Sequence, residues 1–275
     1  MLSEDLFHYT KASTALERIL LEQKIKISQF EGTNDPREFK YLYINSFTGR
    51  LLNKSVDAFE NKVRPILEKA KLKEWKVLCF SQHHPDLVSG KLSEVDNPHL
   101  LGSCLSSMWA HYASTIDKSH DGICLRFNRS RLESQIKGIF YDENRFVIHN
   151  GPVQYNNRML YDLPPFNLDQ LLELDEAGIV DAARKFFAEN HKTIFFLKSE
   201  DWASENEYRW IVHSEKDDAE YVPIDGVLED VYVGENFSRA YYPSVEVLCN
   251  KIGVEPKIIY WENGIPCAQL LKNKK

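Results

Sequence analysis

The densest group of residues able to do chemistry lies in the segment Lys198–Val212, which reads KSEDWASENEYRWIV. From Glu205 onward charged and apolar residues alternate, so a strand would place Glu205, Glu207 and Arg209 on one face. Two carboxylates on a partly enclosed face repel each other and shift their pKa values unless a cation such as Arg209 or Lys198 compensates. This pattern is typical of an arranged site. The alternative interpretation is a solvated edge strand with alternating charges.

Other candidates are isolated polar or aromatic residues in short motifs. His8 lies in a short apolar run, where a hydrogen-bonded core histidine is the alternative to a binding residue. Trp109 and Tyr112 are three residues apart on an expected helix and are therefore neighbours on one side, where core aromatics are equally common. The pair Asn34–Asp35 precedes a proline and indicates first of all a turn and a helix start.

A metal site is an alternative, because six histidines and cysteines fall in one window: Cys79, His83, His84, His99, Cys104 and His111. Structural zinc sites bring their ligands in close pairs such as CxxC or HxxxH, and adjacent His83 and His84 splay their rings apart. We therefore expect no metal. No GxSxG motif occurs, and no cysteine has an evident electropositive setting, so nucleophilic catalysis has little support.

Composition narrows the class of protein. The 275 residues are 43% hydrophobic, which is ample for a core. Lys and Arg total 34 against 41 Asp and Glu, a net charge of -7, so neither a general nucleic-acid surface nor a polybasic membrane segment is expected, although a local basic groove stays open. The chain has no long apolar run and no signal-peptide pattern, which predicts a cytoplasmic location. Its five widely spaced cysteines predict reduced thiols rather than disulfides.

The chemistry-bearing residues must be positioned by strands and helices that hydrophobic periodicity predicts. Strands are expected at 6–9, 24–28, 77–81, 122–127, 138–141, 146–155, 221–224, 230–233 and 257–261, with Asn150–Gly151 as a hairpin signal. Helices are expected at 12–20, 37–74, 103–113, 168–190 and 244–251.

Strands and helices do not alternate regularly along the chain, which favours an α+β fold over a doubly wound α/β sheet. We expect one α+β domain over residues 1–275, with residues 36–75 as a helical insertion or cap. Neither GxGxxG nor GxxxxGK[ST] occurs, so the common nucleotide-binding loops are not supported.

Six short motifs resemble a bacterial family labelled only as domain of unknown function 2971. They are FHYT (7–10), NDPRE (34–38), CFS (79–81), MWAHY (108–112), GICLRF (122–127) and the segment 198–209, and together they cover almost the whole chain. Some relatives are linked with abortive phage resistance, which implies a setting in antiviral defence without naming a reaction.

The chain also resembles, more distantly, the histidine, tyrosine, glutamate type of the ADP-ribosyltransferase superfamily. The resemblance implies NAD as substrate and a split mixed or antiparallel sheet with flanking helices. It makes His8 the donor to the adenosine ribose, Tyr112 the ring stacked on nicotinamide, and Glu207 the carboxylate on the nicotinamide ribose. Glu205 departs from the family pattern and leaves open which glutamate is catalytic. The same motifs add, as further nucleotide-binding or site candidates, Tyr9, Thr10, Phe80, Ser81, Lys198, Arg209, Asn34, Asp35, Glu38, Trp109 and Trp202.

The leading expectation is an enzyme that transfers ADP-ribose from NAD to a protein or nucleic-acid acceptor, or cleaves NAD. A fixed carboxylate near the ribose would stabilise the oxocarbenium-like transition state. One alternative is a nucleotide-sensing or interaction domain without turnover. Another is a metal-dependent hydrolase or nuclease that uses Asp35, Glu38, Glu205 and Glu207. The sequence leaves the acceptor, the oligomeric state and the physiological trigger open.

Overall fold

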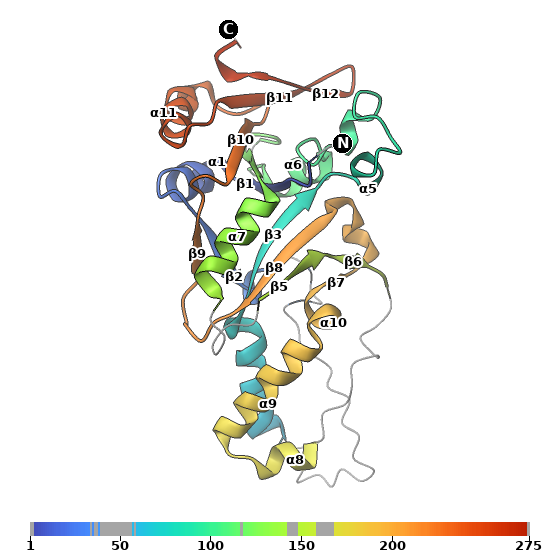
Figure 1. Cartoon of the computed structure of the whole chain (residues 1–275), viewed down its shortest axis with the longest axis vertical. Helices are drawn as coiled ribbons and strands as arrows, with labels where there is room; N and C mark the ends of the chain where they lie inside the picture. Colours follow the sequence, from blue (N-terminus) through green and yellow to red (C-terminus); the bar gives the residue numbers. More distant parts are fainter. Residues whose placement is uncertain are drawn as a thin grey trace.

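A mixed sheet carries the fold of this computed structural model, which describes residues 3–33, 35, 38, 57, 59–115, 118–141, 148–157 and 168–273 (Figure 1). The sheet has ten strands in the order β12-β11-β10-β4-β1-β3-β2-β9, with β8 paired to β3 and β5 paired to β8. These strands are β1 (Leu6–Thr10), β2 (Lys24–Gln29), β3 (Trp75–Gln82), β4 (Ile123–Phe127), β5 (Ile148–Pro152), β8 (Glu207–His213), β9 (Glu220–Pro223), β10 (Leu228–Val233), β11 (Pro256–Glu262) and β12 (Ile265–Leu270). Neighbours are antiparallel except β10 and β11, and the short strands β6 (Gln154–Tyr155) and β7 (Leu197–Lys198) form a separate parallel pair.

The sheet divides along one edge of β3. Near its end β3 pairs with β1, with Phe7 opposite Ser81, whereas near its start it pairs with β2, with Ser28 opposite Val77. Between these two pairings, residues 78–80 of β3 pair with none of the described strands on that edge. On its other edge β3 pairs with β8 along almost its full length. The separation of β1 from β2 therefore leaves a gap beside the middle of β3.

Helices flank the sheet and cover its ends. They are α1 (Ala12–Thr14), α4 (Arg64–Lys69), α5 (Pro85–Val88), α6 (Ser106–Tyr112), α7 (Arg129–Phe140), α8 (Leu168–Glu173), α9 (Glu176–Glu189), α10 (His191–Phe195) and α11 (Tyr242–Ile252). The π-helical segments are η1 (Ala15–Leu20), η3 (Phe59–Val63) and η4 (Ala70–Glu74), and the 3₁₀ segments are η2 (Phe30–Gly32), η5 (Pro98–Leu100), η7 (Glu200–Glu205), η8 (Arg239–Tyr241) and η9 (Leu271–Asn273). In Figure 1, α8 and α9 lie at one end of the molecule, and α11, β11 and β12 lie at the other.

Two apolar clusters pack on opposite faces of β3 and β8, because successive side chains of a strand point to opposite sides. Leu78 and Tyr208 belong to the cluster that also holds the buried residues of α7 and α11. Val77 and Ile211 belong to the second cluster, with the buried residues of α4, α9 and α10. Both strands are thus covered on both faces.

The predicted α+β class is confirmed: the structure has a mixed sheet with flanking helices. Within the expected insertion, residues 59–74 are helical, whereas most of residues 36–58 lie outside the described residues, so the domain boundaries stay a prediction. No helix in the described part of the chain is both long and apolar enough to cross a membrane.

Two expectations about elements are wrong, and one strand is absent from the prediction. The strand predicted at residues 138–141 is largely the end of α7, where the buried residues Leu132, Ile136 and Phe140 recur every four positions. The Asn150–Gly151 pair forms no hairpin, because both residues pair with β8 inside β5. The final strand was not expected at all; β12 follows a turn at Asn263–Gly264, where both residues have positive φ.

Candidate functional site

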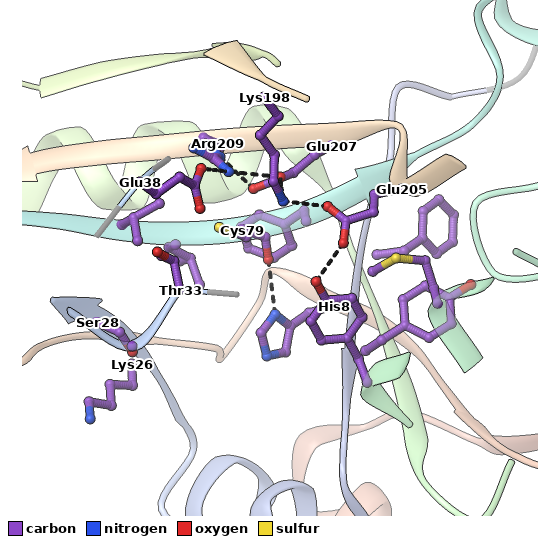
Figure 2. Close-up of a pocket in the computed structure, with 18 of the residues that line it drawn as sticks. His8, Lys26, Ser28, Thr33, Glu38, Cys79, Lys198, Glu205, Glu207 and Arg209 are labelled. Carbon is purple, nitrogen blue, oxygen red and sulfur yellow. Dashed lines mark hydrogen bonds and ion pairs between the residues drawn. The ribbon is translucent and has the colours of Figure 1, made fainter. Parts of the chain in front are cut away.

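A cavity of about 210 Å³ occupies the gap between β1 and β2. Its walls come from β1, β2 and β3, from α6, and from the start of β8 with the segment that leads into it (Figure 2). The lining residues are Phe7, His8, Tyr9, Lys26, Ser28, Gln29, Gly32, Thr33, Glu38, Val77, Leu78, Cys79, Phe80, Met108, Tyr112, Lys198, Glu205, Glu207 and Arg209. Residues far apart in the sequence therefore meet at the division of the sheet.

Glu207 and Arg209 form a buried ion pair on one face of β8. They lie opposite Ser81 and Cys79 of β3. Arg209 Nε donates to Glu207 Oε1 at 2.5 Å, and its second terminal nitrogen donates to Glu207 Oε2 at 2.9 Å. The remaining nitrogen donates to the carbonyl of Phe195 at 2.8 Å. This two-pronged geometry is the strongest that a guanidinium and a carboxylate can adopt.

Glu205 does not lie on the strand face that the alternating pattern predicts. It ends the 3₁₀ segment η7, and Asn206 follows in a left-handed conformation with φ 43° before β8 begins. The Asn206 amide donates to the carbonyls of Gln82 and His83, each at 2.9 Å. This turn directs the Glu205 carboxylate toward Tyr112, whose hydroxyl donates to Glu205 Oε1 at 2.5 Å.

Lys198, at the end of β7, joins the two glutamates. Its ammonium donates to Glu205 Oε2 at 2.6 Å and to Glu207 Oε2 at 3.0 Å, and Figure 2 shows it between them. The ammonium also lies 5.0 Å from the centre of the Trp202 ring, within cation–π range. Trp202 is thus a neighbour of the cluster and is not part of the cavity wall.

Two acidic residues of the predicted loop also lie beside the cluster. Glu38 is buried and pairs with Arg209, so it extends the chain of charges. Asp35 is buried and accepts a hydrogen bond from the backbone N–H of Ser199 at 3.4 Å. Asn34 lies outside the described residues.

The two glutamates have opposite pKa shifts. Burial alone would raise the pKa of Glu207, but the charges of Arg209 and Lys198 outweigh it and hold this pKa at about 2. Burial raises the pKa of Glu205, because Lys198 offsets the desolvation only in part and the Glu207 charge adds to it. Glu207 is therefore a fixed anion at neutral pH, and Glu205 is the easier of the two to protonate.

His8 forms part of the wall on the β1 side. Its Nδ1 donates to the Cys79 carbonyl at 3.0 Å, an oxygen that faces the gap in strand pairing. Burial lowers the pKa of His8, so the ring is neutral near pH 7. Since Nδ1 carries the proton, Nε2 is left as a hydrogen-bond acceptor.

Helix α6 supplies Tyr112 and Met108 to the cavity, whereas Trp109 faces the protein core. Trp109 is fully buried and its indole N–H donates to the Ser103 carbonyl at 2.9 Å. Tyr9 packs edge to face against Trp109 and lines the cavity, with its hydroxyl donated to the Gly102 carbonyl at 2.6 Å. Of the aromatic pair expected on this helix, only Tyr112 reaches the cavity.

The remaining predicted residues fall in two groups. Phe80 lines the cavity as part of the apolar core. Thr10 and Ser81 are buried and are absent from the cavity wall. The edge-strand interpretation of the central segment is wrong, because β8 is paired on both edges and every one of its residues is buried.

The lining residues that were not expected as site residues include Lys26, Ser28, Thr33 and Cys79. The predicted strand at 24–28 contained the signal for two of them, since its alternation places Lys26 and Ser28 on its polar face. Burial raises the pKa of the Cys79 thiol well above its usual value, which makes it a poor nucleophile.

The described side chains of the cavity are poorly suited to bind a metal ion. No group of three His, Cys, Asp or Glu side chains suited to a metal occurs among the described residues. The cavity carboxylates are instead held by Lys198 and Arg209.

Fold and site together define an α+β protein with an internal cluster of charges at the division of a mixed sheet. A family model described as "Protein of unknown function (DUF2971)" matches residues 108–210. This segment runs from α6 into β8 and contains Tyr112, Lys198, Glu205, Glu207 and Arg209. The resemblance to that family is confirmed over this segment. No curated protein and no solved structure gives a significant match to the chain.

Proposed function

We propose that this protein binds NAD in the β1–β2 gap and cleaves its nicotinamide glycosidic bond, in the manner of an ADP-ribosyltransferase, with Glu205 as the catalytic carboxylate. The observation that carries the proposal is the convergence of His8, Tyr112 and Glu205 on one cavity. They come from β1, α6 and η7, three elements separated by long stretches of chain.

Glu205 suits the catalytic role better than Glu207. Both Glu207 oxygens are occupied by Arg209, and one of them also by Lys198. Glu205 is held by one cation and one neutral hydroxyl, which leaves it less neutralised. Glu207 is then a positioning residue that fixes Lys198, and Lys198 in turn fixes Glu205.

The proposed reaction breaks the bond between C1′ of the nicotinamide ribose and the pyridinium nitrogen. The bonding electron pair goes to that nitrogen and neutralises its charge, while C1′ gains oxocarbenium character. A carboxylate beside the ribose stabilises the developing positive charge, most effectively where water is excluded. Water or an acceptor hydroxyl then bonds to C1′, and its proton passes to Glu205, which acts as general base.

The other walls have roles that fit a nicotinamide nucleoside. Tyr112 offers an aromatic wall for the flat nicotinamide ring, held in place by its bond to Glu205. The acceptor Nε2 of neutral His8 is suited to a ribose hydroxyl.

A second candidate is a nucleotide-sensing domain without turnover, and one observation favours it. Lys198 bonds both glutamates, so part of the negative charge that would stabilise an oxocarbenium ion is already neutralised. The metal-dependent hydrolase has no comparable support, because its expected carboxylate ligands Glu38, Glu205 and Glu207 are engaged by cations.

The test is release of nicotinamide from NAD, followed by chromatography, together with calorimetric NAD binding. We expect Glu205→Gln to fold normally and lose at least about 100-fold in nicotinamide release, the scale of a lost general base. The matched control is Glu200→Gln, an exposed residue at the start of η7 that bonds Asn157. Binding without release in the wild-type protein would favour the sensor, and the absence of binding would refute the NAD proposal.

A further inference from the structure

We propose that Lys26 and Ser28 form an anion-binding edge of the cavity that selects substrates carrying a 5′-phosphate, so that the cavity takes the nicotinamide mononucleotide half of NAD. This inference rests on the proposed function and names the part of the substrate that the site reads.

The cations inside the charge cluster are already engaged. Lys198 is bonded to two carboxylates, and Arg209 to two carboxylates and a backbone carbonyl. A phosphate that displaced these partners would leave buried carboxylates without compensation, which is costly. We therefore infer a structural role for Lys198 and Arg209, which the sequence offers as nucleotide-binding candidates.

Lys26 is the exception among the cavity cations. Within the part of the chain that the structure describes, its ammonium has no ion pair and no hydrogen bond, and its side chain is exposed. On β2 the alternate residues Ile25 and Ile27 are buried in the core, so Lys26 and Ser28 share the opposite face and line the cavity. Figure 2 shows the Lys26 side chain extending away from the charge cluster, so its ammonium lies at the outer edge of the cavity. An ammonium and a hydroxyl are both suitable donors to phosphate oxygens.

The two sides of the cavity differ in kind. Lys26 and Ser28 lie on the β2 side, and Glu205 lies on the far side, with His8 of β1 between them in Figure 2. A nicotinamide nucleotide carries its glycosidic bond and its 5′-phosphate on opposite ends of one ribose. The cationic pyridinium would then face the carboxylate side, and the anionic phosphate would face Lys26.

The cavity volume agrees with a single nucleotide. Sites that enclose whole drug-sized ligands measure about 300–1,000 Å³. At about 210 Å³ this cavity encloses less, so the adenosine half of NAD would extend past Lys26 toward solvent. Nicotinamide mononucleotide should therefore be a substrate in its own right.

The experiment compares nicotinamide release from NAD, nicotinamide mononucleotide and nicotinamide riboside by the wild-type protein, Lys26→Met and Lys24→Met. Lys24 is the matched control, since it lies on the same face of β2 but pairs with Glu22 at 2.8 Å and is outside the cavity wall. For the wild-type protein, we expect kcat/KM for NAD and for nicotinamide mononucleotide to exceed kcat/KM for the riboside by at least about tenfold. Lys26→Met should abolish this preference for phosphorylated substrates, and Lys24→Met should keep it. An unchanged ratio in Lys26→Met overturns the inference and leaves the proposed function intact.

Calorimetric binding of ADP-ribose, which lacks nicotinamide, tests the phosphate-binding edge separately from the proposed NAD cleavage. If the wild-type protein cleaves nothing but binds ADP-ribose, and Lys26→Met weakens this binding at least about tenfold, the phosphate edge stands and the proposed cleavage falls. If NAD, nicotinamide mononucleotide and ADP-ribose all fail to bind, both proposals are overturned.

Discussion

Glu207 is buried and both of its carboxylate oxygens are bonded to cations, and these contacts predict its effect on stability. Removing one partner of a buried ion pair leaves the other charge uncompensated, which typically costs about 3–5 kcal/mol. Arg209 is 1% exposed, so water has little access to solvate it if Glu207 is neutralised. The Glu207–Arg209 ion pair therefore stabilises the folded site in addition to positioning its charged groups.

We expect Glu207→Gln to lower the free energy of unfolding at pH 7 by about 3 kcal/mol or more, measured by urea denaturation. The wild-type pKa of about 2 lies below the ordinary 4.5, so between these values the unfolded chain binds more protons than the folded one. Wild-type stability from this group is present above pH 4.5 and lost as the pH falls toward 2. The variant should show less of this acid loss.

The control for this prediction is Glu255→Gln, which removes an exposed partner of Lys272. Exposed pairs contribute little, so its unfolding curve should match the wild type. A Glu207→Gln variant as stable as this control would contradict a structural role for the ion pair.

At the scale of elements, the turn between η7 and β8 decides which glutamate meets Tyr112. Without the left-handed residue Asn206, the strand would continue and place Glu205 beside Glu207. The turn rotates Glu205 out of that register and gives the two carboxylates different surroundings and opposite pKa shifts.

Asn206→Ala should lower the free energy of unfolding by about 2–4 kcal/mol, because it loses two side-chain hydrogen bonds and strains a left-handed residue. Nicotinamide release should fall with it as Glu205 shifts, and Asn206→Gly should be less destabilised since glycine tolerates this conformation. Asn263→Ala, at φ 52° in the β11–β12 turn, is the control. It should lose stability and retain activity; equal activity losses in both alanine variants would refute a local effect.

Most strands were predictable from the sequence because apolar alternation is a local property of each segment. The helical end of α7 differs from the predicted strand because residues 138–141, GIFY, have a short apolar pattern that is also typical of strands. The helical signal is the four-residue spacing of Leu132, Ile136 and Phe140. The Asn263–Gly264 pair is a turn signal that precedes β12 in the sequence. Its counterpart at Asn150–Gly151 was overridden by pairing with β8, which no local pattern reveals.

The candidate site was also predictable only in part, because some of its features depend on local motifs and others on tertiary contacts. His8, Tyr112, Glu205 and Lys198 were accessible from motifs, and the structure brings them to one cavity. The position of Glu205 off the strand was not accessible, because it depends on bonds from Asn206 to residues 82 and 83. The gap in the sheet was also hidden, since strand partners are set by tertiary contacts.

At the scale of the whole molecule, β3 and β8 are shared by both apolar clusters. Their even and odd residues contribute to opposite faces, so a loss of packing in one cluster removes support from strands that the other cluster also uses. The two halves of the molecule in Figure 1 are joined through these two strands.

We therefore expect a single unfolding transition in urea, with coincident midpoints by tryptophan fluorescence and far-ultraviolet circular dichroism. Phe187→Ala, a fully buried residue of the second cluster, should shift both midpoints together and lower the free energy of unfolding by about 3–5 kcal/mol. Separate transitions would show that the end holding α8 and α9 folds independently.

The parting of β1 and β2 along β3 has a consequence for how this protein could be altered. The cavity lies where the main chains of β1 and β2 separate along β3. Substitution of Lys26, Ser28, Met108 or Tyr112 should therefore change which ligands the cavity binds, while the strand pairing of the sheet is kept. Substitutions at lining residues are therefore a route to a different ligand selectivity that leaves the sheet unchanged.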